Sequence, residues 1–279
     1  MTGIALIAGE GALPAALVAA MVERPLIAAL DGYAPFGLTP DLSFRVERLV
    51  PFLNHLRGQG VTRVCFAGAV ARPALDPSLF DPLTAQMVPR LITAMQAGDD
   101  ATLREVLKIF EEFDMEILAA TELAPGLTCA PGVLAGKISP QDVADATRAA
   151  AITAALGAVD VGQGTVVQAG LCLAVETLTG TDAMLQGVAG IAGHLRPKST
   201  KGLYFKALKP GQDWRIDQPT IGPQTLVNTA KAGLGGIVFQ SGGVIVLDQP
   251  ALVKQAESLG LFLWSRPEEK QETQPEIGL

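Results

Sequence analysis

The residues best suited to chemistry in this chain of 279 residues lie around Asp217, in its C-terminal half. Asp217 stands among proline and glycine in the run Trp214–Gly222, just before a predicted helix. A carboxylate in such a place can act as a general base on water or bind a metal ion. Lys206 and Lys209 lie just upstream and can neutralise phosphate charge. The same letters also fit a plain turn in which Asp217 is only a turn residue.

Other polar residues of this half stand at predicted strand ends and helix starts, after the motif Asp-Val-Gly-Gln-Gly that begins at Asp160. They are, in chain order, Gln163, Gln168, Glu176, Thr181 and Asp182. Residues in such places tend to face a cleft rather than a core, so we expect them to contact a substrate or its metal. Glu176 and Asp182, with Asp217, are candidate oxygen ligands for Mg²⁺ or Mn²⁺. A solvated loop, with Asp182 stabilising a helix N-terminus, is the alternative.

Glycine-containing turns follow predicted strands in the N-terminal half. Gly9 and Gly11 come between the first predicted strand and its helix, and Gly68 follows a later strand. Backbone N–H groups and a helix dipole at such a turn can hold a phosphate, and Arg72 could meet an anionic group there. The full dinucleotide fingerprint requires a third glycine where Pro14 stands. A glycine-rich strand-to-helix turn without a ligand is therefore the alternative.

An acidic pair, Asp99 and Asp100, opens a predicted amphipathic helix over Ala101–Phe113. An aspartate in that place is an ordinary N-cap. If the pair faces a cleft between two domains, either carboxylate could hold a metal ion or a sugar hydroxyl. Both interpretations stay open at this point.

The order of these elements predicts a Rossmann-like, doubly wound parallel sheet in the N-terminal half. Short apolar runs alternate there with helical stretches, as in α/β folds whose ligands bind at the carboxyl ends of the strands. The predicted strands are Ile4–Ala8, Leu26–Leu30 and Val61–Ala67, and the predicted helices cover 14–22, Val50–Arg57 and Ala101–Phe113.

The length suits two domains, and an aperiodic run rich in proline and glycine separates them. We predict a Rossmann-like domain over 1–130, a linker over 131–140, a catalytic α/β domain with a mixed sheet over 141–266, and a disordered tail over 267–279. In the second domain, Thr181 is expected to cap a helix. The runs 237–239 and 244–247 predict a hairpin or two neighbouring strands. The active site is expected between the domains.

The net charge of −7, from 21 basic and 28 acidic residues, argues against a sequence-independent nucleic-acid binder. The three cysteines lack a metal-like spacing and predict small buried side chains in a reducing compartment. His55 and His194 lack partners at ligand or triad spacing and predict surface or satisfied residues. The N-terminus has no signal-peptide pattern, and no apolar run could span a bilayer, so we expect a cytoplasmic protein.

Eight segments from both halves carry a family resemblance. In chain order they read IAGEGALP, FAGAVARP, GDDATLREVL, GKISP, DVGQGTVV, AVETLTGTDAML, DQPTIGPQT and AGLGGIVFQSGGVIVLD. No segment is specific alone, but together and in this order they resemble the LpxI type of UDP-2,3-diacylglucosamine pyrophosphatase, from about residue 4 to residue 264.

This resemblance implies hydrolysis of UDP-2,3-diacylglucosamine to UMP and 2,3-diacylglucosamine 1-phosphate in lipid A synthesis. It also implies a divalent metal such as Mg²⁺ and a homodimer. Because such a substrate resides in the membrane, we expect the protein to visit the bilayer surface. The family's key aspartate falls on Asp217, because the following Thr220, Ile221 and Gly222 keep its pattern. Glu10 departs from the family pattern, which has glycine there, and we expect it to alter rather than abolish a nucleotide contact.

Two other classes of protein remain open on the residues alone. A nucleotide- or lipid-binding protein without catalysis fits the incomplete glycine turn and the lack of a His or Cys nucleophile. A dinucleotide-dependent oxidoreductase is disfavoured by Pro14 and by the weak candidate for a ribose ligand, Asp31.

Overall fold

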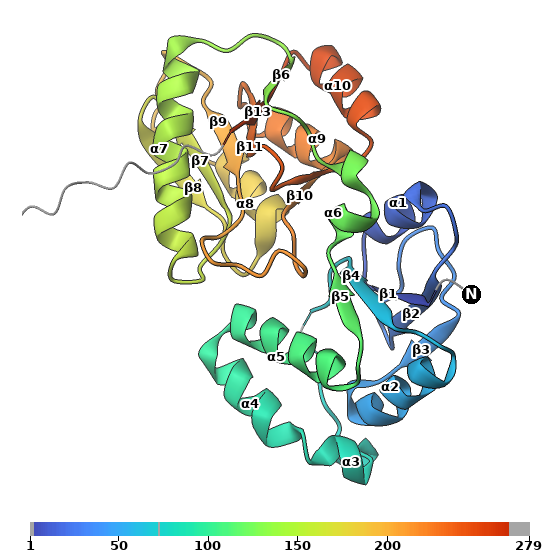
Figure 1. Cartoon of the computed structure of the whole chain (residues 1–279). Helices are drawn as coiled ribbons and strands as arrows, with labels where there is room; N and C mark the ends of the chain where they lie inside the picture. Colours follow the sequence, from blue (N-terminus) through green and yellow to red (C-terminus); the bar gives the residue numbers. More distant parts are fainter. Residues whose placement is uncertain (1–2, 72, 268–279) are drawn as a thin grey trace, which may run out of the picture.

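The computed structural model describes residues 3–71 and 73–267 and has an N-terminal domain with a parallel sheet and a C-terminal domain with a mixed sheet (Figure 1). The predicted fold class is therefore confirmed. Two predictions lie outside the described residues. These are the anion contact at Arg72 and nearly all of the predicted tail, residues 268–279.

The N-terminal sheet has the strand order β3-β2-β1-β4-β5, and every pair in it is parallel. This order is the one found in one half of a dinucleotide-binding fold extended by two strands. The strands are β1 (Ile4–Ala8), β2 (Leu26–Leu30), β3 (Leu42–Phe44), β4 (Arg63–Ala67) and β5 (Glu116–Leu118). Strand β1 is central and buried along its whole length, as expected for a strand covered on both faces.

The helices of this domain lie around the sheet (Figure 1). They are α1 (Leu13–Ala20), α2 (Leu49–Gly58), α3 (Pro82–Ala85), α4 (Val88–Ala97), α5 (Asp99–Glu112) and α6 (Ala120–Leu123). Short 3-10 turns cover Val46–Arg48, Pro77–Leu79 and Pro125–Leu127. Helix α5 buries Leu107 and Phe110 against the sheet and leaves its polar side free for contacts with α4 and with the C-terminal domain.

The C-terminal sheet has the order β6-β13-β11-β9-β7-β8. Its centre, β13-β11-β9, is parallel, while β6, β7 and β8 are antiparallel to their neighbours. Its strands are β6 (Gly132–Ala135), β7 (Gly164–Gln168), β8 (Leu171–Val175), β9 (Leu203–Lys206), β11 (Gly236–Gln240) and β13 (Phe262–Arg266). Strand β6 lies inside the predicted linker, so the second sheet begins there.

The helices of the C-terminal domain are α7 (Pro140–Gly157), α8 (Gly180–Ala189), α9 (Pro223–Lys231) and α10 (Gln249–Ser258). Helix α7 begins as predicted, because Ser139 and Asp142 form a reciprocal capping pair. The predicted cap at Thr181 is wrong: the residue before the helix is Thr179, and Thr181 lies in the first turn with its hydroxyl turned to Lys206.

The predicted hairpin over 237–247 is also wrong. Strand β11 lies in the large mixed sheet, whereas β12 (Ile245–Val246) pairs in parallel with β10 (Thr220–Ile221) in a separate small sheet. The turn between them closes with a bond from Val244 N to Gln240 O and sends the chain away from β11. The partner of β12 is thus a segment directly after Asp217.

Hydrophobic side chains of the C-terminal domain complete the core of the N-terminal domain. Ile245 packs in a cluster with Leu6 and Ala8 of β1, and Ile216 packs in the cluster that contains Ile7. The two domains therefore share buried contacts, one from Ile216 within the loop that carries Asp217 and one from Ile245 of β12.

Candidate active site

Asp217 lies in the loop between β9 and β10, with its backbone in the left-handed region at φ +58°. The residue is exposed to solvent. Although the residue is exposed, the protein packed around its carboxyl group limits the hydration of the charge, and this burial raises the pKa of Asp217. The positive charges of Lys209 and Lys206 oppose the increase, and the negative charges of Glu176 and Asp160 add to it. A reachable carboxylate that holds its proton more tightly than usual is suited to accept a proton from a bound water.

Lys206 lies near Asp217 at the end of β9 and is 5% exposed. Its ammonium donates to Thr181 Oγ1 at 2.7 Å and lies 3.6 Å from Glu176 Oε2. Tyr204, two residues earlier on the same face of β9, donates from its hydroxyl to Glu176 Oε2 at 3.4 Å and lies 3.2 Å from Thr181 Oγ1. A buried cation is thus held by a carboxylate and a hydroxyl from two other elements.

Two glycines let the start of β7 approach this cluster. A β-carbon on Gly162 would collide with the backbone oxygen of Glu176, and one on Gly164 would collide with the Glu176 carboxylate and lie 2.9 Å from the Tyr204 hydroxyl. The motif Asp-Val-Gly-Gln-Gly therefore has a packing reason: only glycine leaves room for Glu176 and Tyr204 at these positions.

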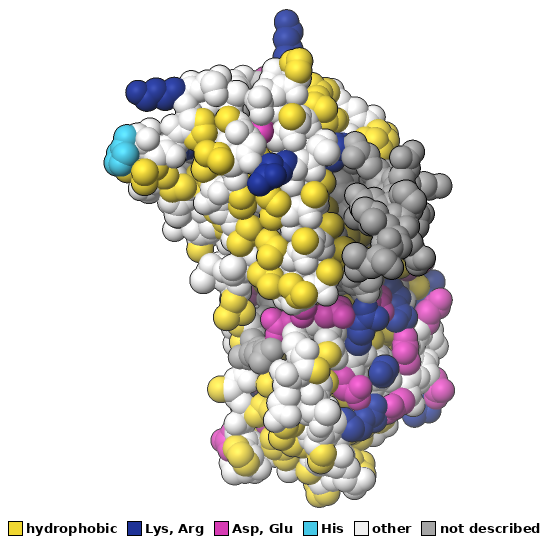
Figure 2. All heavy atoms as spheres, turned by 90° about the vertical axis from the view of Figure 1, so that its left-hand side faces the viewer, with side chains coloured by type: hydrophobic (Ala, Val, Ile, Leu, Met, Phe, Trp, Pro, Cys, Tyr) yellow, Lys and Arg dark blue, Asp and Glu magenta, His cyan; other side chains and the backbone are white. Residues whose placement is uncertain are grey.

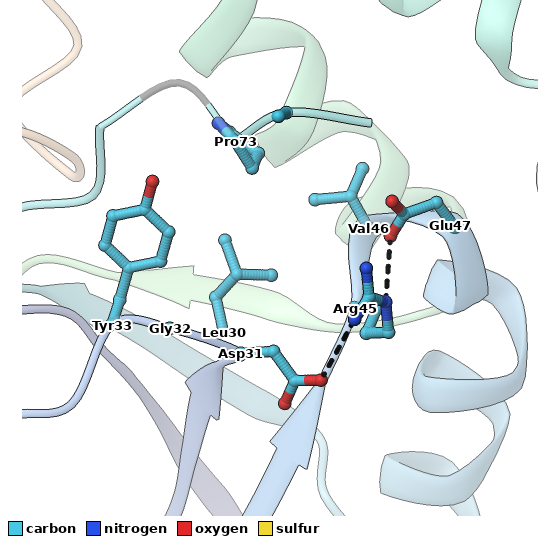
Figure 3. Close-up of a pocket in the computed structure, with 9 residues that line it drawn as sticks. Leu30, Asp31, Gly32, Tyr33, Arg45, Val46, Glu47 and Pro73 are labelled. Atoms are coloured by element: carbon cyan, nitrogen blue, oxygen red, sulfur yellow. Dashed lines mark ion pairs between the residues drawn. The ribbon is translucent and has the colours of Figure 1, made fainter. Parts of the chain in front are cut away.

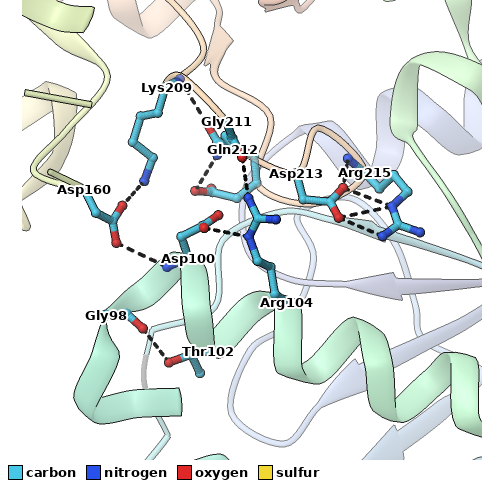
Figure 4. A network of polar contacts seen from close by, with 11 residues as sticks. Gly98, Asp100, Thr102, Arg104, Asp160, Lys209, Gly211, Gln212, Asp213 and Arg215 are labelled. Carbon is cyan, nitrogen blue, oxygen red and sulfur yellow. Dashed lines mark hydrogen bonds and ion pairs between the residues drawn. The ribbon is translucent and has the colours of Figure 1, made fainter. Parts of the chain in front are cut away.

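Lys209 forms the second cationic contact of the site. Its Nζ lies 2.6 Å from Asp160 Oδ1, and Asp160 Oδ2 accepts from the backbone N–H of Asp100 at 3.3 Å (Figure 4). Burial opposes the charge on Asp160, but Lys209 and the N–H groups at the start of α5 lower the pKa of this carboxyl group overall. The acidic pair at the start of α5 therefore lies at the contact between the domains, with Asp100 also bound to Arg104 at 2.7 Å.

Gln163 and Asp182 complete the polar residues near the lysines. Gln163 accepts a bond from Ala207 N through its backbone oxygen, while its buried Oε1 has no hydrogen-bond partner among the described residues. This acceptor is therefore available to a donor group of a ligand. Asp182 is exposed, with Oδ1 accepting from Asn228 Nδ2 at 2.7 Å.

The site provides only some of the ligands that a metal ion needs. Within residues 3–71 and 73–267, no group of three or more His, Cys, Asp or Glu side chains is arranged to hold a metal ion. Glu176 is engaged by Lys206 and Tyr204, whereas the Asp217 carboxylate has, among the described residues, one weak hydrogen bond, from Gln212 Nε2 at 3.5 Å. Mg²⁺ commonly takes one or two carboxylates and completes its shell with water and substrate phosphates, so Asp217 fits as such a ligand.

Several predicted substrate residues have hydrogen-bond or packing partners within the protein. Gln168 is 3% exposed and donates to the carbonyls of Pro197 and Thr200. Ile221 is buried in the core of the C-terminal domain. Thr220 donates to Gln218 O at 3.2 Å, and Gly222 donates from its backbone to Thr225 Oγ1 at the start of α9. These contacts fix the chain after Asp217.

The N-terminal glycine turns bind each other. Gly9 N donates to Ala67 O and Glu10 N to Ala69 O, both at 2.8 Å, while Ala69 N donates to Glu10 O at 2.9 Å. A β-carbon on Gly9 would lie 2.5 Å from Ala69 O, and one on Gly68 would lie 2.7 Å from Gly9 C. Close approach therefore explains both glycines, and these N–H groups are not available to a phosphate. At Gly11, whose φ is +94°, a β-carbon would meet no atom of residues 3–71 and 73–267 within 4 Å.

A cavity of about 340 Å³ lies at the carboxyl end of β2 (Figure 3). Asp31 and Tyr33 line it on one side, and Arg45 lies 3.7 Å from Asp31 and 3.4 Å from Glu47. The cavity has the place of a ribose pocket in a Rossmann fold, but the Asp31 carboxylate already faces a cation.

Three contributors to this site were not predicted from the sequence. Tyr204 could have been found, because it alternates with Lys206 along one strand face. Arg104 and Glu111 of α5, which contact the loop of Asp217, gave no local signal. The cysteine prediction was right for the buried Cys65 and Cys129 and wrong for Cys172, which is exposed on β8. His55 and His194 are exposed, as predicted.

Fold and site define a two-domain α/β protein in which an aspartate and two lysines of a mixed-sheet domain lie beside a Rossmann-like domain. Residues 3–127 match the family model of the LpxI N-terminal domain, and residues 130–264 match that of the LpxI C-terminal domain. The protein named UDP-2,3-diacylglucosamine pyrophosphatase LpxI of Caulobacter vibrioides is 39% identical over 272 residues, which cover 94% of this chain and 97% of that protein. The chain belongs to the LpxI family.

Proposed function

We propose that this protein hydrolyses the pyrophosphate bond of UDP-2,3-diacylglucosamine to UMP and 2,3-diacylglucosamine 1-phosphate, a step of lipid A synthesis. The name of the Caulobacter vibrioides relative supports the substrate. The observation that carries the proposal is the accessible Asp217 carboxylate, whose pKa is raised, close to Lys206 and Lys209. A carboxylate to receive a proton and cations to bind phosphate oxygens are what water attack on a diphosphate requires.

In this proposal, Asp217 orients the attacking water or holds a metal ion, and the lysines bind phosphate oxygens. The site has three carboxylates and two lysines, so it carries one negative charge in excess. The carboxylates are those of Asp217, Glu176 and Asp160, and the lysines are Lys206 and Lys209. A diphosphate therefore needs a further cation. We propose Mg²⁺, or Mn²⁺, held by Asp217 and the substrate phosphates, where it would supply that positive charge.

The unpartnered Oε1 of Gln163 gives the proposed substrate a place to donate a hydrogen bond. A hydroxyl of the sugar or the N–H of the uracil ring can fill it. Contacts such as that between Asp160 and the start of α5 support placement of the substrate between the domains. Gly11, Asp99, Asp100, Thr181, Thr220 and Gly222 remain proposed substrate neighbours.

The acyl chains need apolar surface near the reacting phosphates. Val159, Leu178 and Trp214 are exposed by 69%, 92% and 45%, and each lies within three residues of Asp160, Glu176 or Asp217. In Figure 2, hydrophobic side chains gather over the upper part of the molecule, the C-terminal domain, while the acidic side chains lie mainly in the lower part. Among the described residues, no helix is long and apolar enough to cross a membrane. We propose that the protein works in the cytoplasm and touches the bilayer surface through such side chains.

We also propose that the protein is a homodimer. Strand β8 is an edge of the C-terminal sheet, and it exposes Leu171 by 54% and carries no charged side chain. An uncharged apolar edge strand of this kind usually has a covering partner. Light scattering on the eluting protein tests this proposal: a mass of 58 kDa, twice the 29.0 kDa of the chain, is expected.

The function is tested by incubating purified protein with UDP-2,3-diacylglucosamine and Mg²⁺ and measuring UMP. UMP should form with Mg²⁺, cease with a chelator and return when Mg²⁺ is added. Asp217→Asn should reduce kcat by at least a hundredfold, because asparagine keeps the left-handed backbone but cannot take the proton. Retained binding without UMP would instead favour a non-catalytic binder. Near-normal turnover by the variant would refute the role of Asp217.

A dinucleotide-dependent oxidoreductase is not supported by the turn after β1. In such enzymes the N–H groups of this turn face a pyrophosphate, whereas those of Gly9 and Glu10 bond to Ala67, the last residue of β4, and to Ala69.

A further inference from the structure

The loop that carries Asp217 is attached to the N-terminal domain on both sides of this residue. The loop covers 207–219 and belongs by sequence to the C-terminal domain. Ile216, directly before Asp217, is 8% exposed and packs in the hydrophobic core of the N-terminal domain. Gln218, directly after it, places Oε1 3.4 Å from Thr121 Oγ1 of α6. The position of Asp217 therefore depends on both domains.

Helix α5 adds two contacts from a single face. Arg104 donates from Nη2 to the carbonyl of Gly211, and Glu111 accepts from Arg215 Nη1 at 2.8 Å. Arg104 and Glu111 are two turns apart, so their side chains point to the same side of the helix. Figure 4 shows Arg104 reaching from α5 to the loop, with Arg215 further along the same loop.

We propose that Arg104 and Glu111 are positioning residues for Asp217, through which the N-terminal domain fixes the loop at the reacting phosphate. This proposal rests on the proposed pyrophosphatase function. Asp217 needs such support, because a non-glycine residue at φ +58° relaxes unless its surroundings hold it. Arg215 and Glu111 are 33% and 42% exposed, so their ion pair alone is weak and acts together with Arg104 and Ile216.

The neighbouring face of α5 supplies a matched control. Glu112 binds Arg90 of α4 through two bonds of 2.7 and 2.9 Å, entirely within the N-terminal domain. Its exposure of 47% is close to that of Glu111. Glu111→Gln and Glu112→Gln therefore make the same chemical change in adjacent residues, and each removes one ion pair with an arginine. Only the first touches the loop of Asp217.

The test compares UMP release by the wild type, Glu111→Gln, Glu112→Gln and the charge-neutral pair Arg104→Gln with Glu111→Gln. We expect the double variant to lower kcat about tenfold with KM changed less than twofold, because misplacing a catalytic group by about 1 Å slows chemistry without weakening substrate binding. Glu112→Gln should stay within twofold of the wild type. Hydrogen exchange of the amides of 212–218 should be faster in the double variant and unchanged in Glu112→Gln.

Equal kinetic effects of Glu111→Gln and Glu112→Gln, or a loss that falls on KM alone, would overturn the positioning role. The melting temperature of each variant shows whether a loss of activity comes from unfolding. If the double variant does not fold, the comparison is made with Glu111→Gln alone. If the wild type releases no UMP, the proposed function fails. The exchange experiment then still decides whether α5 holds the loop, and unchanged exchange would refute that directly.

Discussion

Replacing Gly164 by alanine adds one methyl group at a place where the structure has no room for it. The new β-carbon would collide with Glu176 Oε2 and lie 2.9 Å from both Cε2 and the hydroxyl of Tyr204. Tyr204 is fully buried, and Glu176 is 8% exposed and held by Lys206. Neither neighbour can move aside without disturbing the cation of the site.

The size of the effect follows from the cost of overpacking. An added methyl group in a close-packed interior costs about 1–3 kcal/mol, so Gly164→Ala should lower the free energy of unfolding by that amount. Gly187, in α8 of the same domain, is the matched control, because a β-carbon there would meet no atom of the described part of the chain within 4 Å. Gly187→Ala should instead stabilise the protein by about 0.5–1 kcal/mol through its higher helix propensity.

Both tryptophans, Trp214 and Trp264, lie in the C-terminal domain, so urea unfolding followed by tryptophan fluorescence reports on the domain that carries both substitutions. The two variants should move the transition midpoint in opposite directions with the same slope. UMP release should fall in Gly164→Ala only, since Lys206 is displaced with Glu176. Unchanged stability of Gly164→Ala, or a shared direction of the two shifts, would refute the packing argument.

Three further predictions concern charge and the bilayer. Because burial raises the pKa of Asp217, the folded state keeps the carboxyl proton to a higher pH than the unfolded state does. The free energy of unfolding of the wild type should therefore fall, relative to that of Asp217→Asn, as the pH rises above 3.8, the ordinary pKa of this group. A difference between the two proteins that does not change with pH would contradict this prediction. The pKa of Asp160 shifts in the opposite direction, because Lys209 lowers it more than burial raises it. Asp160→Asn should therefore lower the free energy of unfolding in urea by about 1–2 kcal/mol at pH 7, and this loss should shrink as the pH falls below 3.8. Leu178→Ser should weaken binding to lipid vesicles about tenfold in a sedimentation assay, because Leu178 is 92% exposed and a leucine contributes about 1.5 kcal/mol when it is buried in lipid. Equal binding of the variant and the wild type would show that Leu178 does not contact the bilayer.

Local periodicity predicted the regular elements that are long and apolar. The bounds of β1 and β2 agree with those predicted from the sequence, because uninterrupted apolar runs ended by a glycine or an aspartate define them. The short strands β3 and β5 were missed, since three residues carry no measurable period. The pairing of β12 was wrong for another reason: sequence proximity favoured β11, but the partner is the segment after Asp217.

The residues near Asp217 could be collected from the sequence because they stand at ends of strands in one sheet. Lys206, Glu176 and Thr181 lie together in the structure. The turn at Gly9 could not be interpreted in the same way. Its glycine is explained by the approach of Ala69, 60 residues away, and a single segment does not record such a contact.

Backbone strain connects the two domains to the chemistry of the site. Among the described residues, the non-glycine positions with positive φ are Asp114, Asp160, Ala169, Asp217 and Asp248. Two of these aspartates, Asp160 and Asp217, belong to the site, and each costs about 1 kcal/mol or more to hold in this conformation.

Glycine would remove this strain but would also remove the carboxylate, so the strain must be opposed by contacts elsewhere. For Asp160 these contacts come from Lys209 and the N–H groups that begin α5. For Asp217 they come from Ile216 in the core of the N-terminal domain and from Gln212, which donates to Asp217 O at 2.9 Å. Both strained carboxylates thus depend on the N-terminal domain. A substitution there can slow the reaction without touching any residue that meets the substrate.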